Sequence, residues 1–439
     1  MHYYADLHIH SRYARACSPQ LTLENIDLWC RIKGLSLVSC GDFTHPKWFA
    51  EIQSKLEPVG NGLYRLKPNL RIKDPRFKEP AIKDVYFIIG TELSCIYTHS
   101  GKARRVHHCL FVPSIEAAGV LIKQLTGRGC NLKADGRPII GLSSQDLLKL
   151  LLEVDDRSVL IPAHAWTPWF AIFGSKSGYD SISECFEDLS KHIFAIETGL
   201  SSDPAMNWRV ADLDQVALIS NSDAHSLPNL GREANVFEGE KISYDLIWQA
   251  VRHASPNARE HNKNKGQLQL SKTIEFFPHE GRYHWDGHRD CKVVFAPSET
   301  KKRKGICPNC GRQLTVGVLS RVEDLSTRQE NYKLASAVPF LSLIELDKLI
   351  AQAQGVKGRK TKAVEAEYWG LVSAFDGEMN VLVDAPLTDL ADKTTPMVVE
   401  AIKRLRQGQV TIKPGYDGVY GEIHIFGDQE QVKPQKSLF

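Results

Sequence analysis

The sequence predicts an α/β protein in which a barrel of strands and helices precedes a small cysteine-containing module and a mainly helical C-terminal region. Three observations lead to this prediction. Short β-branched runs alternate with amphipathic stretches over residues 1–250, and these runs end in His, Asp or Glu. Closely spaced cysteines occur only in residues 251–330. Helical patterns dominate residues 331–439, so we expect three domains with these boundaries.

The first run, "HYYADLHIH", has the alternation of a strand and a polar end. His8 and His10 are two positions apart, so on a strand their side chains point to the same face. Two imidazoles on one face can hold one metal ion or two neighbouring ions. Surface or capping histidines explain an isolated pair equally well, so the later runs decide between the two interpretations.

Further runs of the same kind follow, and each carries a residue that is able to bind metal. They are "LSLVSCGD" with Asp42 and nearby His45, "VYFIIGTEL" with Glu92, "RRVHHCLFVP" with His107 and His108, "SVLIPAHAW" with His164, "HIFAIETG" with Glu197, and "VALISNSDAH" with Asp223 and His225.

Helical segments fill the gaps between these runs. "LTLENIDLWCRIKG", "SSQDLLKLLLEV" and "SISECFEDLSKH" have apolar residues at helical spacing, and Thr22 and Ser144 stand where helix N-caps are expected. Alternating strands and helices favour parallel strands joined by right-handed crossovers. In a barrel of this kind the carboxyl ends of the strands converge on one face. We therefore expect the polar strand ends to form a multinuclear metal site.

The motifs "DLHIH", "GD" followed by "TH", "GTEL", "RVHH", "PAHAW" and "NSDAH", in this order, resemble those of the PHP (polymerase and histidinol phosphatase) superfamily. The resemblance implies a distorted (β/α)7 barrel with up to three divalent metals, Zn, Mn or Mg, that hydrolyses phosphate esters. It implies Asp223, Glu92 and Asp42 as catalytic residues. It implies the metal ligands His8, His10, Asp42, Glu92, His107, His164, Asp223 and His225.

The chain departs from the superfamily pattern at two places. The second motif has Asp42-Phe43 where the superfamily often has Asp-His, which leaves open whether His45 takes part. A further ligand that usually follows the first motif has no clear counterpart in "SRYARACSPQ", where Cys17 is a candidate. Of His107 and His108 only one can face inward on a strand, and we expect His107 because "RVH" aligns with the superfamily pattern.

These residue types suit hydrolysis of a phosphodiester. Metal ions lower the pKa of bound water, and a bridging carboxylate such as Glu92 can hold two cations close together. Mixed His and carboxylate ligands suit Zn, Mn or Fe better than Mg alone, because Mg prefers oxygen.

Composition places the chain in the ordinary globular class. The 439 residues are 42% apolar and 24% charged, the net charge is +3, and no apolar stretch approaches the ~20 residues of a membrane helix. The N-terminus lacks the pattern of a signal peptide. Seven of the ten cysteines stand singly, several within apolar runs, as buried free thiols do. A reducing cytoplasm fits these features best.

The remaining three cysteines form a second metal signature. Cys307 and Cys310 are the ends of "CPNC", and His288 and Cys291 form an HxxC pair upstream. These four ligands are enough for one closed, tetrahedral structural zinc. His284 is also near and is an alternative fourth ligand. A redox CxxC is the other interpretation, but no thioredoxin-like βαβ pattern surrounds it.

Two basic runs follow the predicted barrel, "KKRK" at 301–304 and "KGRKTK" at 357–362. Each is explained by a solvated charged surface, but behind a phosphoesterase-like barrel we expect contacts with a phosphate backbone. The stretches "LSLIELDKLIAQAQG", "VEAEYWGLVSAF" and "TPMVVEAIKRLRQGQV" predict the C-terminal helices.

Long stretches of the chain resemble the endonuclease Q family, among them "HAWTPWFAIFGSKSGYDSI", "ETGLSSDPAMNW" and "PGYDGVYGE". The resemblance implies a DNA repair enzyme that cuts on the 5′ side of a deaminated base (hypoxanthine, uracil or xanthine) or of an abasic site. A histidinol-phosphate-like phosphatase is the alternative activity, and a DNA-binding protein with a vestigial barrel is a third. The ending "QVKPQKSLF" is similar to tails that bind sliding clamps.

An enzyme that tests one base must take that base out of the stack. The aromatic residues after His164 are candidates to stack on it, although an aromatic lid packed on the barrel explains them as well. The candidate DNA- and base-binding residues are Trp166, Trp169, Phe170, Lys176, Arg104 and Arg105.

Overall fold

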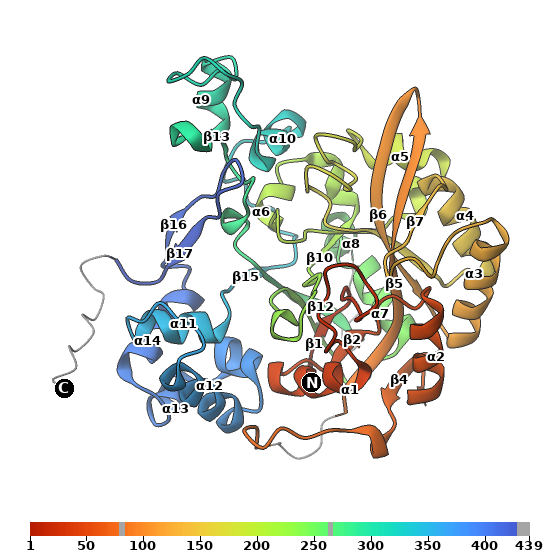
Figure 1. Cartoon of the computed structure of the whole chain (residues 1–439), viewed down its shortest axis with the longest axis horizontal. Helices are drawn as coiled ribbons and strands as arrows, with labels where there is room; N and C mark the ends of the chain where they lie inside the picture. Colours follow the sequence, from red (N-terminus) through yellow and green to blue (C-terminus); the bar gives the residue numbers. More distant parts are fainter. Residues whose placement is uncertain (79–83, 262–266, 428–439) are drawn as a thin grey trace.

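The computed structural model describes residues 1–78, 84–261 and 267–427. A mixed sheet with its helices is formed by residues 1–275 and by one later strand, β15 (Phe340–Ser342). Two further parts flank it, a small module carrying α9, β13 and α10 and a helical part carrying α11–α14 (Figure 1). Among the described residues no helix is long and apolar enough to cross a membrane.

The large sheet has the order β15-β12-β11-β1-β2-β5-β4-β3, and β6 and β7 also pair with β5. β8 pairs with β6, β9 pairs with β10, and β8 lies against β9. Beyond β10 a parallel bridge joins Ile9 to Ala224, which brings the end of this series back to the segment that follows β1. The strands are β1 (His2–Asp6), β2 (Leu37–Ser39), β3 (Leu56–Gly60), β4 (Leu63–Leu66), β5 (Tyr86–His99), β6 (Lys102–Val112), β7 (Ile139–Ile140), β8 (Val159–Pro162), β9 (Ala195–Glu197), β10 (Ala217–Ile219), β11 (Ala234–Glu238), β12 (Gln269–Glu275) and β15 (Phe340–Ser342).

The expectation of parallel strands joined by crossovers holds for only part of the sheet. β1–β2, β2–β5 and β9–β10 are parallel, but β5–β6 and β6–β8 are antiparallel. The cause is a tight hairpin, because Ser100 and Gly101 have φ of 51° and 73° and join β5 directly to β6. Two-residue loops with positive φ at both positions have the twist that antiparallel strands require.

Helices cover the sheet between these strands. Thr22 caps α1, because its hydroxyl accepts from the Asn25 N–H at 3.3 Å. Ser143, and not Ser144, caps α4 through the Asp146 N–H at 3.0 Å. Ser144 instead begins the helix, and its buried hydroxyl contacts His108. The helices are α1 (Leu23–Lys33), α2 (Pro46–Lys55), α3 (Ile115–Gly127), α4 (Ser144–Val154), α5 (Ile182–Phe186), α6 (Pro204–Asn207), α7 (Tyr244–Arg252) and α8 (Pro256–His261).

The two flanking parts are small and differ in composition. The first is a short antiparallel hairpin with two helices, and the second is a group of helices that ends in another hairpin. The elements are β13 (Asp286–His288), β14 (Val293–Phe295), α9 (Pro297–Lys302) and α10 (Val318–Leu325), then α11 (Leu346–Ala353), α12 (Lys362–Ala374), α13 (Leu387–Ala391), α14 (Pro396–Arg406), β16 (Thr411–Lys413) and β17 (Glu422–His424).

A buried ion pair fixes the C-terminal helices to the sheet domain. The Lys33 ammonium at the end of α1 lies 2.7 Å from a Glu378 carboxylate oxygen, and the side chains are 5% and 4% exposed. The Tyr368 hydroxyl donates to the same oxygen at 2.8 Å. Directly beside this pair, a Cβ on Gly377 would come within 2.6 Å of the Gly34 Cα, so the close approach of the two backbones requires glycine at position 377.

Replacing Lys33 by Met is expected to destabilise the protein by about 3–5 kcal/mol, because Glu378 would remain buried without its counter-charge. Lys403→Met is the matched control, since Lys403 pairs with Glu400 at the surface and should change stability by at most about 1 kcal/mol. The measurement is the urea midpoint followed by circular dichroism. Equal midpoints for the two variants would contradict this account of the interface.

Candidate metal centre

Four side chains from distant parts of the chain bring ligand atoms together beyond the end of β1. His8, His10, Glu92 and Asp223 each offer one atom, and these atoms all lie within 4.8 Å of one another. The Asp223 carboxylate lies 3.0 Å from His10 Nε2 and 3.7 Å from His8 Nε2. Both histidines are buried, whereas the Asp223 side chain is 23% exposed, so the group is reached from solvent on the side of Asp223.

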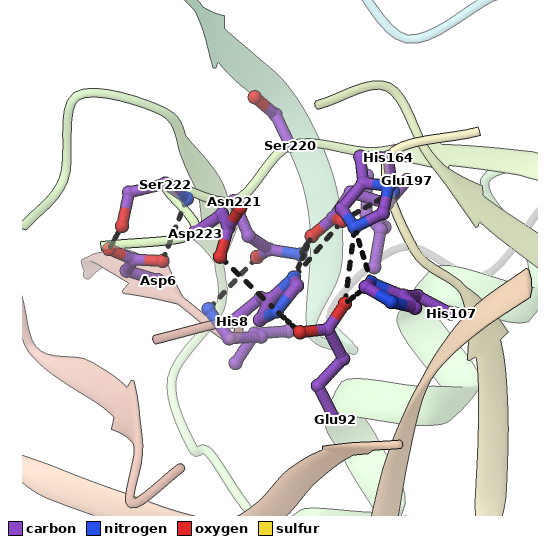
Figure 2. A network of polar contacts seen from close by, with 12 residues as sticks. Asp6, His8, Glu92, His107, His164, Glu197, Ser220, Asn221, Ser222 and Asp223 are labelled. Atoms are coloured by element: carbon purple, nitrogen blue, oxygen red, sulfur yellow. Dashed lines mark hydrogen bonds and ion pairs between the residues drawn. The ribbon is translucent and has the colours of Figure 1, made fainter. Parts of the chain in front are cut away.

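Glu92 on β5 belongs to two such groups. One of its oxygens lies 2.8 Å from His107 Nδ1 and 3.1 Å from His164 Nε2, and these three residues form the second group. Its other oxygen faces His10 Nε2 at 3.2 Å. Figure 2 shows Glu92 between His8 on one side and the pair of His107 and His164 on the other. A carboxylate in this position can bridge two cations.

The two neighbouring histidines of β6 point in opposite directions. His107 faces Glu92, whereas His108 Nε2 lies 2.8 Å from the Ser144 hydroxyl on the far side of the strand. Burial lowers the pKa of His107 to about 4 and that of His108 to about 3, so both rings are neutral. A neutral imidazole has a free lone pair, as a metal ligand must.

The donor atoms fit a bound cation. His8 Nε2, His10 Nε2 and Asp223 Oδ1 are buried and have no well-formed hydrogen bond within the described part of the chain. Buried polar atoms are almost always satisfied, so three converging exceptions indicate a missing partner such as an ion. Burial would raise the pKa of Glu92, but Arg137 and the surrounding imidazoles lower it well below its usual range, so Glu92 is a carboxylate.

Asp6 and Glu197 hold this arrangement from outside. The Glu197 carboxylate lies 3.0 Å from His8 Nδ1 and accepts from the His164 backbone N–H at 2.7 Å. Asp6 accepts from the Ser222 backbone N–H and hydroxyl at 3.1 and 2.6 Å, and so fixes the residue before Asp223. Carboxylates of this kind orient ligating histidines and raise their basicity. Glu197 was recognised in the sequence as a polar strand end, but its role next to His8 was not predicted.

Sequence reasoning missed Arg137 altogether. Its guanidinium lies 3.1 Å from Glu92 and is three-quarters buried. The preceding Gly136 touches the site, because a Cβ there would come within 2.4 Å of the Asp42 carboxylate. Arg137 comes from the loop before β7, not from a predicted strand end, so only the tertiary structure reveals it. "DGRP" was the sole local signal, and it indicates no more than a turn.

Asp42 was expected to be a direct metal ligand, but it lies at the edge of the site and outside both ligand groups. Its oxygens contact His10 Nδ1 at 2.9 Å and accept from the Ser11 N–H and hydroxyl at 2.6 and 2.7 Å. Asp42 therefore orients His10 in this structure. His225 also stands outside the two groups, since its Nδ1 lies 2.8 Å from the Asp223 carbonyl oxygen.

Two further candidates lie near the site without joining these groups. The His45 ring stacks on Tyr13, with a distance of 4.5 Å between ring centroids. Cys17 is a half-buried free thiol outside the ligand groups. A different cysteine, Cys109, forms a group with His8 and Glu197.

The six candidate DNA-binding residues divide by exposure. Trp169 is 43% exposed, and Lys176 and Arg105 are exposed as well. Phe170 is half-buried, with its ring 4.8 Å from that of His107.

The other two, Trp166 and Arg104, lie inside the fold, contrary to what contact with DNA requires. Trp166 is 1% exposed and donates to Asn207 at 2.8 Å. Arg104 is 5% exposed, pairs with Glu184 and stacks on Tyr179. Long-range partners explain the burial of both side chains.

A separate candidate metal site, made of one histidine and three cysteines, lies in the small module. Its four residues all place a ligand atom within 4.8 Å of one another, and Cys310 Sγ lies 3.6 Å from His288 Nδ1. This set of one imidazole and three thiols is consistent with structural zinc. His284 instead stacks on His279 with a distance of 4.3 Å between ring centroids. The four residues are His288, Cys291, Cys307 and Cys310.

Each of the two basic runs has exposed lysines and one arginine that is bound to a carboxylate. All four residues of 301–304 are exposed at the end of α9, although Lys301 lies 3.3 Å from Asp324 and Arg303 lies 2.8 Å from Glu299. In the run 357–362 the lysines are exposed, but Arg359 is bound to Asp347 at 2.5 Å.

The chain is similar to a family model and to two curated proteins. A model of the MJ0043 C-terminal domain matches residues 345–409. The uncharacterized protein MJ0043 of Methanocaldococcus jannaschii is 33% identical over 310 residues, which cover 68% of this chain and 36% of that protein. This chain therefore spans about a third of the length of that relative. The uncharacterized protein YqxK of Bacillus subtilis is 28% identical over 434 residues, 96% of this chain and 98% of that protein.

Two solved structures are similar along their full length. The lesion-specific endonuclease PfuEndoQ of Pyrococcus furiosus has a TM-score of 0.82 and 28% identity, over 99% of this chain and 98% of that chain. Endonuclease Q in complex with a 27-mer duplex that has an abasic lesion at its active site has a TM-score of 0.79 and 28% identity, over 100% of both chains. The chain thus has the mixed α/β structure of endonuclease Q over its whole length.

Proposed function

We propose that the chain is a metal-dependent endonuclease that cuts the DNA phosphodiester bond 5′ of a deaminated base or an abasic site during DNA repair. One observation supports this most: two ligand groups share Glu92 in a chain that matches endonuclease Q from end to end. The ring of strands around the site fits a distorted (β/α)7 barrel of the PHP type.

Each ligand group has a definite place in this proposal. His8, His10, Glu92 and Asp223 would hold one divalent cation, and Glu92 with His107 and His164 would hold a second. Such cations supply Lewis-acid stabilisation of phosphate oxygens and activate water near neutral pH. Glu197 and Asp42 keep His8 and His10 in their rotamers, and Asp6 fixes Ser222, the residue before Asp223. The preorganised donors then need no rearrangement when a phosphate enters.

We assign to Arg137 a contact with the scissile phosphate. Its guanidinium already stands against the shared carboxylate, and the charge of Glu92 raises the pKa of Arg137 further, so this cation persists at any working pH. A guanidinium can bind two phosphate oxygens at once and stabilise the negative charge that develops on them.

Arg137→Met is expected to lower the incision rate about 100- to 1,000-fold while the metal content stays unchanged. Arg137→Lys should recover part of the rate, because it keeps the charge but not the fork of donors. Quenched-flow incision of a lesion duplex and metal analysis of the same samples measure this. A full incision rate in Arg137→Met would remove Arg137 from the mechanism.

A small-molecule phosphatase is the alternative that the same metal centre allows. A phosphatase of this kind would not need the exposed Trp169, nor the His288 and cysteine group and the basic residues of the small module. The full chain should therefore hydrolyse p-nitrophenyl phosphate far more slowly than it cuts a lesion duplex. The opposite order of rates would favour the phosphatase.

The test of the function uses 5′-labelled duplexes with deoxyinosine, deoxyuridine or an abasic site at one position, each with Mn or Mg. A single product that ends directly 5′ of the lesion, and no product from the undamaged duplex, is the expected result. Cutting of both duplexes alike would leave a nuclease without lesion specificity. The proposed sliding-clamp contact involves the terminal "QVKPQKSLF", which lies outside the described residues.

A further inference from the structure

The segment 165–181, here named the aromatic loop, lies directly on the metal centre. It begins after His164, and the Thr167 hydroxyl lies 3.2 Å from His164 Nδ1. The His107 backbone N–H donates to the Phe170 carbonyl at 3.0 Å. His164 and Phe170 have positive φ, 30° and 61°, which costs free energy in residues other than glycine. Contacts from elsewhere must therefore keep the loop in this conformation.

Arg321 on α10 supplies such contacts from the small module. Its Nε donates to the Phe173 carbonyl at 3.0 Å, and its Nη2 donates to the Tyr179 carbonyl at 2.9 Å. Nη2 also lies 2.6 Å from the Asp180 carboxylate. One guanidinium thus binds two backbone carbonyls of the loop, and the two residues that carry them are six positions apart in sequence. Trp169 is held at the same surface, because its ring makes an edge contact with Tyr283 at 6.0 Å.

The position of α10 depends in turn on the strand that carries a zinc ligand. The buried Asp286 accepts from the Gly317 N–H and the Ser320 hydroxyl at the start of α10, both at 2.6 Å. Asp286 and His288 are the two ends of β13. A carboxylate at a helix N-terminus is stabilising, so β13 fixes both the start and the direction of α10. A continuous series of contacts then runs from the zinc group to the aromatic loop.

We infer that Arg321 is a positioning residue through which the zinc-binding module holds the aromatic loop over the metal centre. In this arrangement the module contributes to incision without touching the reacting phosphate. The expected loss of incision rests on the proposed function. The expected loosening of the loop does not depend on it. Arg104 holds the loop from the opposite side, at Gly178 and Tyr179, so loss of Arg321 should loosen the loop without unfolding it.

The experiment compares Arg321→Met with Arg328→Met in the full-length protein. Arg328 is the matched control, since it also joins the module to the sheet domain but contacts Trp208 and Asp214 and not the loop residues 168–180. Hydrogen exchange of residues 168–180 and tryptic cleavage after the exposed Lys176 report on the loop directly. We expect both rates to rise about tenfold in Arg321→Met only, and incision at saturating DNA to fall about tenfold. The barrel metal content should not change.

Arg321→Lys provides a second variant should the Met variant fail to fold. A lysine keeps the charge but cannot join both carbonyls, so a smaller loosening of the loop is expected. Unchanged exchange and cleavage in the folded Arg321 variants, or equal changes in Arg328→Met, would overturn the inference. If the wild-type protein cuts no lesion, the proposed function fails, but the exchange and cleavage rates still decide the role of Arg321.

Discussion

Replacing Glu92 by Gln is expected to lower lesion incision by about a thousandfold or more and to reduce the number of Mn ions bound. The reason is geometric. One oxygen of Glu92 faces His107 and His164, and the other faces His10, so one side chain serves both ligand groups. A neutral amide keeps the shape but loses the negative charge that would hold the two proposed cations together. Mn titration followed by electron paramagnetic resonance, with incision assays on the same protein, measures both effects.

Glu116→Gln is the control for this substitution. It removes one carboxylate from the exposed first turn of α3, far from the ligand groups, and should leave metal binding and incision unchanged. The account fails at this point if Glu92→Gln binds as many Mn ions, as tightly, as the wild-type protein. It also fails if the control loses activity to the same extent.

Cys310→Ser is expected to abolish zinc binding in the small module and to unfold its hairpin. The module's own apolar cluster contains only Val293, Cys307 and Leu314 as buried residues, so little else stabilises it. Metal binding is folding free energy in such small sites, on the order of 10 kcal/mol or more. Zinc content by mass spectrometry should fall by one ion per chain, and backbone hydrogen exchange over residues 286–315 should become fast.

Cys130→Ser is the matched control, because Cys130 is a half-buried free thiol outside the zinc group. Its zinc content and the exchange over residues 286–315 should equal those of the wild-type protein. A Cys310→Ser variant that keeps its zinc would show that His288, Cys291 and Cys307 are sufficient, or that a different residue is the fourth ligand.

Part of the site was predictable because it follows from periodicity. The alternation of the first run placed His8 and His10 on one face, and the polar end of a later run brought Asp223 toward them. Glu92 also reaches the site, but from the interior of β5 and not from its end. The HxxC and CxxC spacings likewise brought together the four residues of the small module. These features depend on local geometry, which the sequence encodes directly.

The remaining features depend on partners far away in the chain. Arg137 reaches Glu92 from a loop, and no pattern in "DGRP" indicates this. Trp166 and Arg104 were predicted to contact DNA, but both are buried, Trp166 with a hydrogen bond to Asn207 and Arg104 with an ion pair to Glu184. The antiparallel β6 follows from the Ser100-Gly101 turn, which the alternation of strands and helices does not reveal.

The measurement that tests the central claim most directly compares wild-type protein and Asp223→Ala on one 5′-labelled duplex with a single abasic site, in Mn. Asp223 completes the first ligand group through its contacts with His8 and His10. The account predicts one cut directly 5′ of the lesion by the wild-type protein and none by the variant. Equal cutting by Asp223→Ala would show that the metal centre described here does not carry the reaction.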